Sequence, residues 1–139
     1  MNNKSVAFPL WGLCQYSGEV NSRDQPHGFG TAVREDGDRY EGTYQDGSLV
    51  TGKWFWSDGF LEYEGEFKRG RSHGTGTEFD RDGKVGTGRW EESSFIDGTV
   101  TFPDGTVITG RWEEDLFKDG TITYPDGRVV KFVNGERVY

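Results

Sequence analysis

Residues 63–83 read YEGEFKRGRSHGTGTEFDRDG and combine regularly spaced glycines with aromatic and charged residues. Tyr63, Gly65 and Phe67 alternate with glutamates, which is the period of a β-strand with its aromatic rings on one face. A glycine between two such rings leaves room for a neighbouring ring to lie over the backbone. The Asp-Gly pair at the end is typical of a turn, because glycine accepts a positive φ. The stretch therefore predicts a β-hairpin.

The same combination recurs in five cycles along the 139 residues. Asp-Gly pairs follow one another at intervals of 22, 24, 22 and 22 residues, and two further series of glycines keep step with them. The pairs begin at Asp36, Asp58, Asp82, Asp104 and Asp126. Three glycine series in phase indicate a repeat protein, in which successive hairpins form an antiparallel meander.

Each cycle approximates the pattern Y-x-G-x-aromatic, a turn, H-G-x-G and then T-x-T-x-P-D-G, over roughly residues 16–130. This pattern resembles the membrane occupation and recognition nexus (MORN) repeat. The copies differ, since Gly86 and Ile108 replace the leading aromatic residue in the last two cycles. The complete His-Gly-x-Gly motif occurs only at residues 27–30 and 73–76. The resemblance implies a non-catalytic scaffold or adaptor that binds a protein partner.

The predicted fold is all-β, a single-layer twisted antiparallel β-meander of about five MORN-type hairpins with ten or eleven strands. We expect residues 1–15 to form an N-terminal cap and residues 16–139 to form the sheet. The expected repeats lie near residues 16–39, 40–62, 63–85, 86–107 and 108–130, followed by a closing strand at 131–139. The second strand of each hairpin, which ends at the Asp-Gly turn, is called the return strand. Val33 and Phe79 lie one step from the aromatic positions of the other return strands, so those two strands face differently or carry a bulge.

Composition favours a thin sheet over a thick core, since only 32% of the residues are apolar whereas 15% are aromatic. The net charge of −8 predicts that the protein does not bind nucleic acid and is repelled on average by anionic bilayers. Cys14 is the only cysteine, so no intrachain disulfide forms and a reduced, cytoplasmic setting is expected. Peripheral attachment to a membrane stays compatible with this setting.

No motif points to catalysis, a cofactor or a metal. GRSHGTG lies between two predicted strands and opens no helix, so it lacks the aligned amides of a phosphate loop. The segment from Asp80 to Lys84 lacks the further acidic ligands of a calcium loop. His27 and His73 occupy equivalent positions two cycles apart, which favours a structural role. We therefore predict that the chain is not an enzyme.

Two surfaces are candidates for binding. A single-layer sheet has no second layer to cover its aromatic face, so this face could bind an amphipathic helix or an extended peptide. The alternative is that the rings only stack on one another as a thin core. The proposed anchors are Trp54, Trp56, Trp90 and Trp112, flanked by Tyr44 and Phe67.

The second surface is the basic tip, which we define as Lys68, Arg69 and Arg71. It could hold a phospholipid head group, as the family name suggests, or be a solvated turn. The matching tips of the next two cycles are acidic and would suit a basic partner or be solvated turns. The terminal strands offer open edges for a homodimer, and the resemblance implies that such repeats also accompany enzymes as accessory domains.

Overall fold

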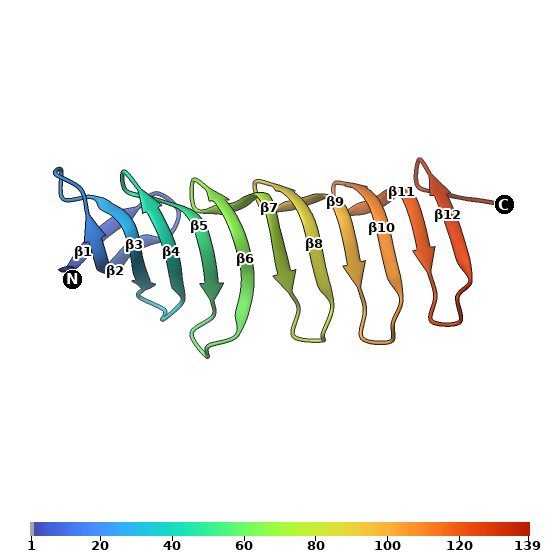
Figure 1. The fold of residues 1–139 in the computed structure, drawn as a ribbon, viewed down its shortest axis with the longest axis horizontal. Helices are drawn as coiled ribbons and strands as arrows, with labels where there is room; N and C mark the ends of the chain where they lie inside the picture. Colours follow the sequence, from blue (N-terminus) through green and yellow to red (C-terminus); the bar gives the residue numbers. More distant parts are fainter. Residues whose placement is uncertain (1) are drawn as a thin grey trace.

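The computed structural model describes residues 2–139 and contains one antiparallel sheet of 13 strands. Every strand pairs with its neighbours in the chain, so the sheet is an open meander with β1 and β13 as its two edges. Figure 1 shows β2 to β12 following one another along the sheet. The described residues form no helix. The predicted all-β meander of hairpin repeats is confirmed.

The strands are joined by short turns at two opposite margins of the sheet (Figure 1). The strands are β1 (Asn2–Phe8), β2 (Gly12–Val20), β3 (Pro26–Arg34), β4 (Arg39–Gln45), β5 (Ser48–Phe55), β6 (Leu61–Lys68), β7 (Arg71–Phe79), β8 (Val85–Glu91), β9 (Ser94–Thr101), β10 (Val107–Glu113), β11 (Leu116–Thr123), β12 (Val129–Val133) and β13 (Glu136–Val138). The sheet has more strands than the ten or eleven predicted, because β1 and β13 extend it at its two ends.

The Asp-Gly pairs form the turns along one margin. In the turn after β9, the Gly105 amide donates to the carbonyl oxygen of Phe102 at 3.0 Å. The carboxylate of Asp104 accepts the amide of Thr106 at 2.8 Å. Gly105 has a φ of 95°, which a residue with a side chain rarely adopts. These aspartates therefore act as turn residues.

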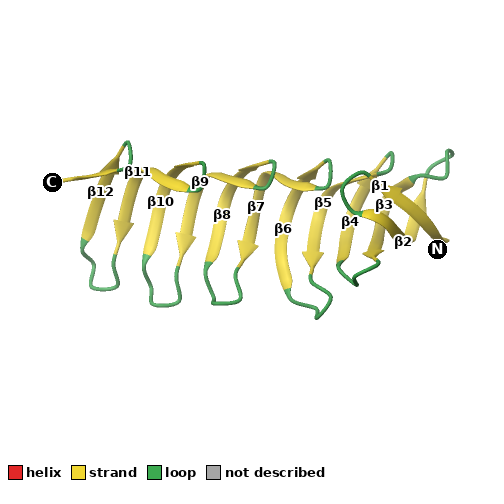
Figure 2. Ribbon diagram, turned by 180° about the vertical axis from the view of Figure 1, so that it is seen from behind, coloured by secondary structure: helices red, strands yellow, loops and turns green. Residues whose placement is uncertain are grey.

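A row of glycines crosses the sheet from β2 to β11, with one glycine on each strand facing the next in register. The row consists of Gly18, Gly30, Gly42, Gly52, Gly65, Gly76, Gly88, Gly98, Gly110 and Gly120. It ends at β12, where Gly120 pairs with Phe132. The upper parts of the strands bend away from the lower parts, which folds the sheet lengthwise into a trough (Figure 2).

Two kinds of contact exclude a side chain from the glycine row. At Gly76 an added Cβ would lie 2.0 Å from the hydroxyl oxygen of Tyr63, whose ring lies over the glycine. At Gly110 an added Cβ would lie 1.9 Å from the carbonyl oxygen of Asp119 on the neighbouring strand. The first contact is the predicted ring over the backbone. The second is a close approach of two backbones, which the sequence patterns did not indicate.

The interval between Asp58 and Asp82 is longer than the others because the strands in it contain extra bulge residues. Gly65 pairs with Gly76 and Phe67 with Ser72, so β7 has two more residues than β6 between these pairs. The corresponding part of β5 has one more residue than β4. A second irregularity lies where Trp54 pairs with Tyr63 but Phe55 pairs with Leu61. The bulge in β7 thus has one residue more than the bulge in β5, and β6 has one extra residue between Leu61 and Tyr63. These two residues explain the interval of 24 in place of 22.

The return strands β3 and β7 differ from the other return strands in which residues face inward, as predicted. In both strands the residue that pairs with the leading tyrosine precedes the apolar one, since Ala32 pairs with Tyr40 and Glu78 pairs with Tyr63. Ala32 is completely buried, and Glu78 lines hollows of the aromatic face. Because side chains alternate along a strand, Val33 and Phe79 point to the outer face. A carboxyl side chain consequently takes an inner position in the third cycle.

Candidate functional site

The inner face of the trough carries a continuous row of aromatic rings. Successive ring centroids lie 3.7 to 6.5 Å apart from one end of the row to the other. The row runs through Phe8, Trp11, Tyr40, Phe67, Tyr63, Trp90, Phe95, Trp112, Phe117 and Phe132. Aromatic pairs at such distances attract one another in addition to burying area. The row thus extends along nearly the whole sheet.

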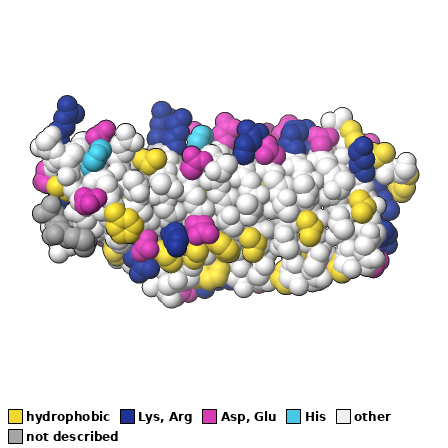
Figure 3. Space-filling view, viewed as in Figure 1, with side chains coloured by type: hydrophobic (Ala, Val, Ile, Leu, Met, Phe, Trp, Pro, Cys, Tyr) yellow, Lys and Arg dark blue, Asp and Glu magenta, His cyan; other side chains and the backbone are white. Residues whose placement is uncertain are grey.

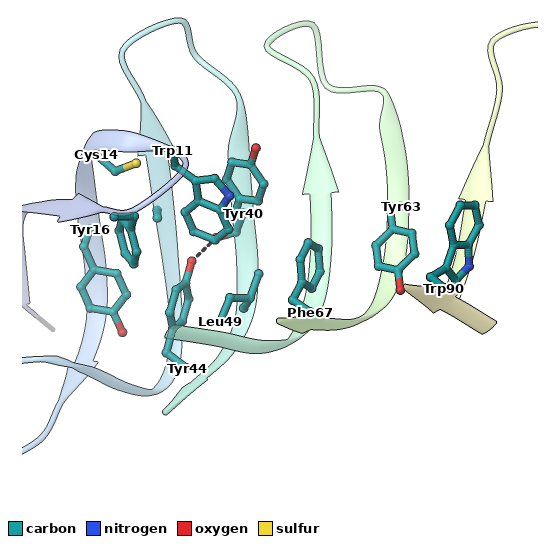
Figure 4. Close-up of a cluster of buried hydrophobic side chains, with 11 residues drawn as sticks. Trp11, Cys14, Tyr16, Tyr40, Tyr44, Leu49, Tyr63, Phe67 and Trp90 are labelled. Atoms are coloured by element: carbon teal, nitrogen blue, oxygen red, sulfur yellow. Dashed lines mark hydrogen bonds between the residues drawn. The ribbon is translucent and has the colours of Figure 1, made fainter. Parts of the chain in front are cut away.

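The N-terminal connection fills the first part of this face. The loop between β1 and β2 places Trp11 on Tyr40, with centroids 3.7 Å apart and the rings inclined by 12°. The indole Nε1 of Trp11 donates to the carbonyl oxygen of Gly70, 59 residues away, at 3.0 Å. Phe8 and Trp11 are both buried, and Figure 4 shows Trp11 beside Tyr40. We call β1 to β7, which this loop covers in part, the filled half.

Three of the proposed anchors are buried. Tyr44 is 1% exposed, and its hydroxyl donates to the carbonyl oxygen of Tyr40 at 2.7 Å. Phe67 packs edge-on against Tyr63 with a centroid separation of 5.1 Å. The indole Nε1 of Trp90 donates to the carbonyl oxygen of Gly76 at 3.0 Å. These rings act as core, as the alternative interpretation held.

The other three anchors retain exposed surface but do not form one patch. Trp54 is half-buried and stacks parallel to Tyr40 at 6.0 Å. Trp56 is 38% exposed, lies 5.1 Å from Trp54, and donates from its Nε1 to the Glu62 carboxylate at 2.7 Å. Trp112 is half-buried on β10, several strands away from the other two. The structure therefore separates the tryptophans into two groups.

Past Trp90 the inner face is uncovered. A hollow of about 380 Å³, which we call the open hollow, lies over β8, β9 and β10. Its floor is apolar and consists of Trp90, Phe95, Val100, Phe102, Ile108 and Trp112. We call β8 to β13 the open half. In the view of Figure 3, hydrophobic side chains gather in the lower part of the molecule and charged side chains along the upper margin.

Acidic side chains also line the open hollow, and one of them, Glu78, has a raised pKa. Burial and the nearby charge of Glu62 raise the pKa of Glu78 to about 7, against the opposing effect of Lys84. Asp80 and Asp115 line the same hollow. In the sequence, Phe79 lies one step from the aromatic positions of the other cycles. Because side chains alternate along a strand, this offset already implies that Glu78 points to the inner face.

The basic tip lies beside a different cavity. Lys68, Arg69 and Arg71 line a space of about 500 Å³ together with Trp11 and Leu49. The sequence predicted the tip but not the apolar cavity, because the loop that contributes Trp11 is far away in the chain. Arg69 has a φ of 53°, so the tip is a tight turn.

The two histidines link neighbouring turns. The Nδ1 atom of His27 accepts the backbone amide of Asp46 at 3.1 Å. The Nδ1 atom of His73 accepts the amide of Glu92 at 3.5 Å, the same contact two cycles later. Among residues 2–139, no group of His, Cys, Asp and Glu side chains could hold a metal ion. In that part of the chain no helix is long and apolar enough to cross a membrane.

Comparison with known proteins agrees with the repeat geometry. The family described as MORN repeat matches residues 16–39 and 63–85. These segments are the two cycles that contain the complete His-Gly-x-Gly motif. No curated protein matches the chain. The MORN repeat is generally a non-enzymatic repeat module. The chain is therefore a β-meander repeat protein that contains MORN repeats.

Proposed function

We propose that this protein is a non-catalytic scaffold or adaptor that binds an amphipathic segment of another protein in its open half. The observation that carries the proposal is the aromatic row, which continues from the filled half into the open hollow. Burying apolar surface on both sides would favour binding. MORN repeats are an interaction and membrane-association module, which is consistent with this role.

Within this proposal the six predicted anchors have different tasks. Trp112 contacts Phe95 and Phe117 at 4.8 and 5.0 Å and offers the central ring surface of the open half. Trp54 and Trp56 offer a second, smaller surface beside the filled half. Tyr44, Phe67 and Trp90 hold the neighbouring rings in place from within the core. A bound segment would lie lengthwise along the trough.

A selection from a library of random peptides tests the proposal with defined ligands. We expect selected peptides to bind the wild-type protein and to lose most of their affinity for Trp112→Ala. The double variant Trp54→Ala, Trp56→Ala should weaken only peptides that extend toward the filled half. Phe29→Ala is the matched control, because Phe29 is an exposed ring on the outer face of β3.

The variants are compared by thermal unfolding, so that a loss of binding is not confused with a loss of fold. If the selected peptides bind Trp112→Ala as well as they bind the wild type, the open half is not the binding surface. A failure to select any peptide from the library would also contradict the proposal.

A second candidate function is binding of an anionic lipid at the basic tip. The specific observation is the cavity of about 500 Å³ beside it, whose apolar walls include Phe8, Leu10 and Leu49. Cations at the mouth of an apolar cavity suit a phosphate head group that carries an acyl chain. MORN-repeat proteins are often cytoplasmic or membrane-associated, and we propose a cytoplasmic setting with attachment of this kind.

Sedimentation with vesicles tests this second function. Vesicles that contain phosphatidic acid should bind the wild type at low salt and release it as salt is added, because screening weakens surface electrostatics. Replacing Lys68, Arg69 and Arg71 by glutamine should abolish binding. A control that replaces Lys53, Lys131 and Arg137 by glutamine carries the same charge change elsewhere. Equal loss in both variants would show only a net-charge effect and would rule out a site.

A further inference from the structure

The third return strand places carboxyl groups where the other late strands place apolar ones. The two inner positions at the end of each return strand alternate with outward residues, so they are two residues apart. In the third cycle they are Glu78 and Asp80, and both line the open hollow. In the second, fourth and fifth cycles they are Trp54 and Trp56, Val100 and Phe102, and Ile122 and Tyr124. The acidic pair is thus local to one end of the hollow.

Glu78 lies at the boundary between the filled and the open half. It lines the open hollow and also a smaller space of about 130 Å³ beside Tyr40, Trp54 and Tyr63. On β7 it lies between Tyr63 on β6 and Gly86 on β8. Gly86 has no side chain, and it lines the open hollow together with Glu78.

The charged residues near the Glu78 carboxyl do not supply enough positive charge to balance the negative charge there. Glu62 on β6 is held by the Trp56 indole and repels it, and Asp80 adds a further negative charge. Lys84, in the turn before β8, partly compensates. Arg71, on β7, lines the smaller space with Glu78. The charge near Glu78 therefore favours an additional cation.

The far end of the open hollow is acidic as well. Asp115 lines it from the turn between β10 and β11, and Glu114 precedes Asp115 in that turn. Of the charged residues that line the open hollow, three are acidic and one, Lys84, is basic. An apolar floor between acidic ends complements a ligand that is apolar in its middle and positively charged.

We infer that the segment bound in the open hollow is a basic amphipathic peptide, with a lysine or arginine against Glu78 and apolar side chains on Phe95 and Trp112. The inference rests on the proposed function and adds the chemical class of the partner. A further cation of the peptide beside the Trp112 indole would gain a cation–π attraction. An acidic peptide would meet carboxylates at both ends and be rejected, so Glu78 determines specificity.

A synthetic amphipathic peptide of leucine and lysine is the probe for this inference. Its counterpart has glutamate in place of every lysine and the same leucine spacing. At low salt and about pH 8, above the Glu78 pKa of about 7, we expect the lysine peptide to bind. The glutamate peptide should bind at least about tenfold more weakly.

Glu78→Gln should weaken binding of the lysine peptide about tenfold and remove most of its dependence on pH between about 6 and 8. In the wild type, affinity should rise with pH in this range, because Glu78 loses its proton and attracts the cation more strongly. The lysines of the peptide stay charged throughout. Glu35→Gln is the matched control, since Glu35 lies in the exposed turn after β3.

The outcomes separate this inference from the proposed function. Peptides that need Trp112 but bind equally well with lysine or glutamate would overturn the inference and leave the scaffold function standing. Equal binding by Glu78→Gln and Glu35→Gln would also overturn it. Loss of all peptide binding in the wild type would contradict both proposals.

Discussion

The filled and the open half contain the same aromatic row but expose it differently. In the filled half, Trp11 is stacked on Tyr40 and hydrogen-bonded to Gly70, so the inner face is covered from within the chain. In the open half, Trp112 packs against Phe95 and Phe117, the rings beside it in the row, and stays half-buried. The comparison teaches that one repeat geometry can build either a core or a binding surface. What lies over the rings makes the difference.

The N-terminal loop also indicates how a ligand can occupy the trough. Trp11 lays its ring flat on the inner face while its Nε1 donates to a carbonyl oxygen of an upper turn. It therefore combines apolar contact with a hydrogen bond to the backbone at the margin. A partner segment in the open half would need the same two elements.

The largest expected effect comes from removing this cover. Trp11→Ala should lower the free energy of unfolding by about 3–5 kcal/mol, because it empties a buried site and removes a hydrogen bond. Urea unfolding measures the change. Trp112→Ala, which truncates a half-buried ring in the open half, should cost clearly less. Equal losses would show that the two halves do not differ in the way described.

A smaller effect is expected from placing a methyl group in the glycine row of the open half. Gly110→Ala should destabilise the protein by about 2 kcal/mol or more, because the Cβ would meet the Asp119 carbonyl oxygen. Gly127→Ala is the control, as its φ is 89° but no atom lies within 4 Å of an added Cβ. It should cost only about 1 kcal/mol. Thermal unfolding that ranks Gly127→Ala as the more harmful would contradict the close approach of the two backbones at Gly110.

The smallest effect concerns pH at the boundary of the two halves. The pKa of Glu78 is about 7 in the folded protein and near 4.5 in an unfolded chain. Between these values the folded state holds the proton that the unfolded state has lost, so stability falls as pH rises from about 4.5 to 7. Glu78→Gln should show a flatter pH dependence in this range by urea unfolding. An unchanged slope would mean that Glu78 is solvated like a surface carboxylate.

The meander and its turns could be predicted from the sequence because they repeat. Asp-Gly pairs and glycines in phase are a periodic signal, and the structure has the predicted hairpins. The cover over the filled half gives no such signal, since Trp11 contacts Tyr40 and Gly70 across long stretches of chain. The sequence therefore left open whether these rings form a binding face or a thin core, and the structure shows Tyr44 and Phe67 buried.

Glu78 illustrates a different limit. Its inner position follows from alternation on β7, and Phe79 already indicated that alternation in the sequence. Its raised pKa depends on Glu62 and Lys84, which come near it only when strands pair. The sequence shows that a charged residue stands in an otherwise apolar row. It does not show which residues of the neighbouring strands lie beside that charge.

The regular pairing of one strand after another gives the molecule a fixed length scale. Each strand advances the trough by roughly 4.8 Å, so the stretch from β8 to β12 is about 20 Å long. An extended peptide would cover that distance with about six residues, and a helix with about thirteen. Each added repeat would lengthen the surface by about 10 Å without changing its cross-section. The number of uncovered repeats would thus set the length of the partner segment that the inner face can bind.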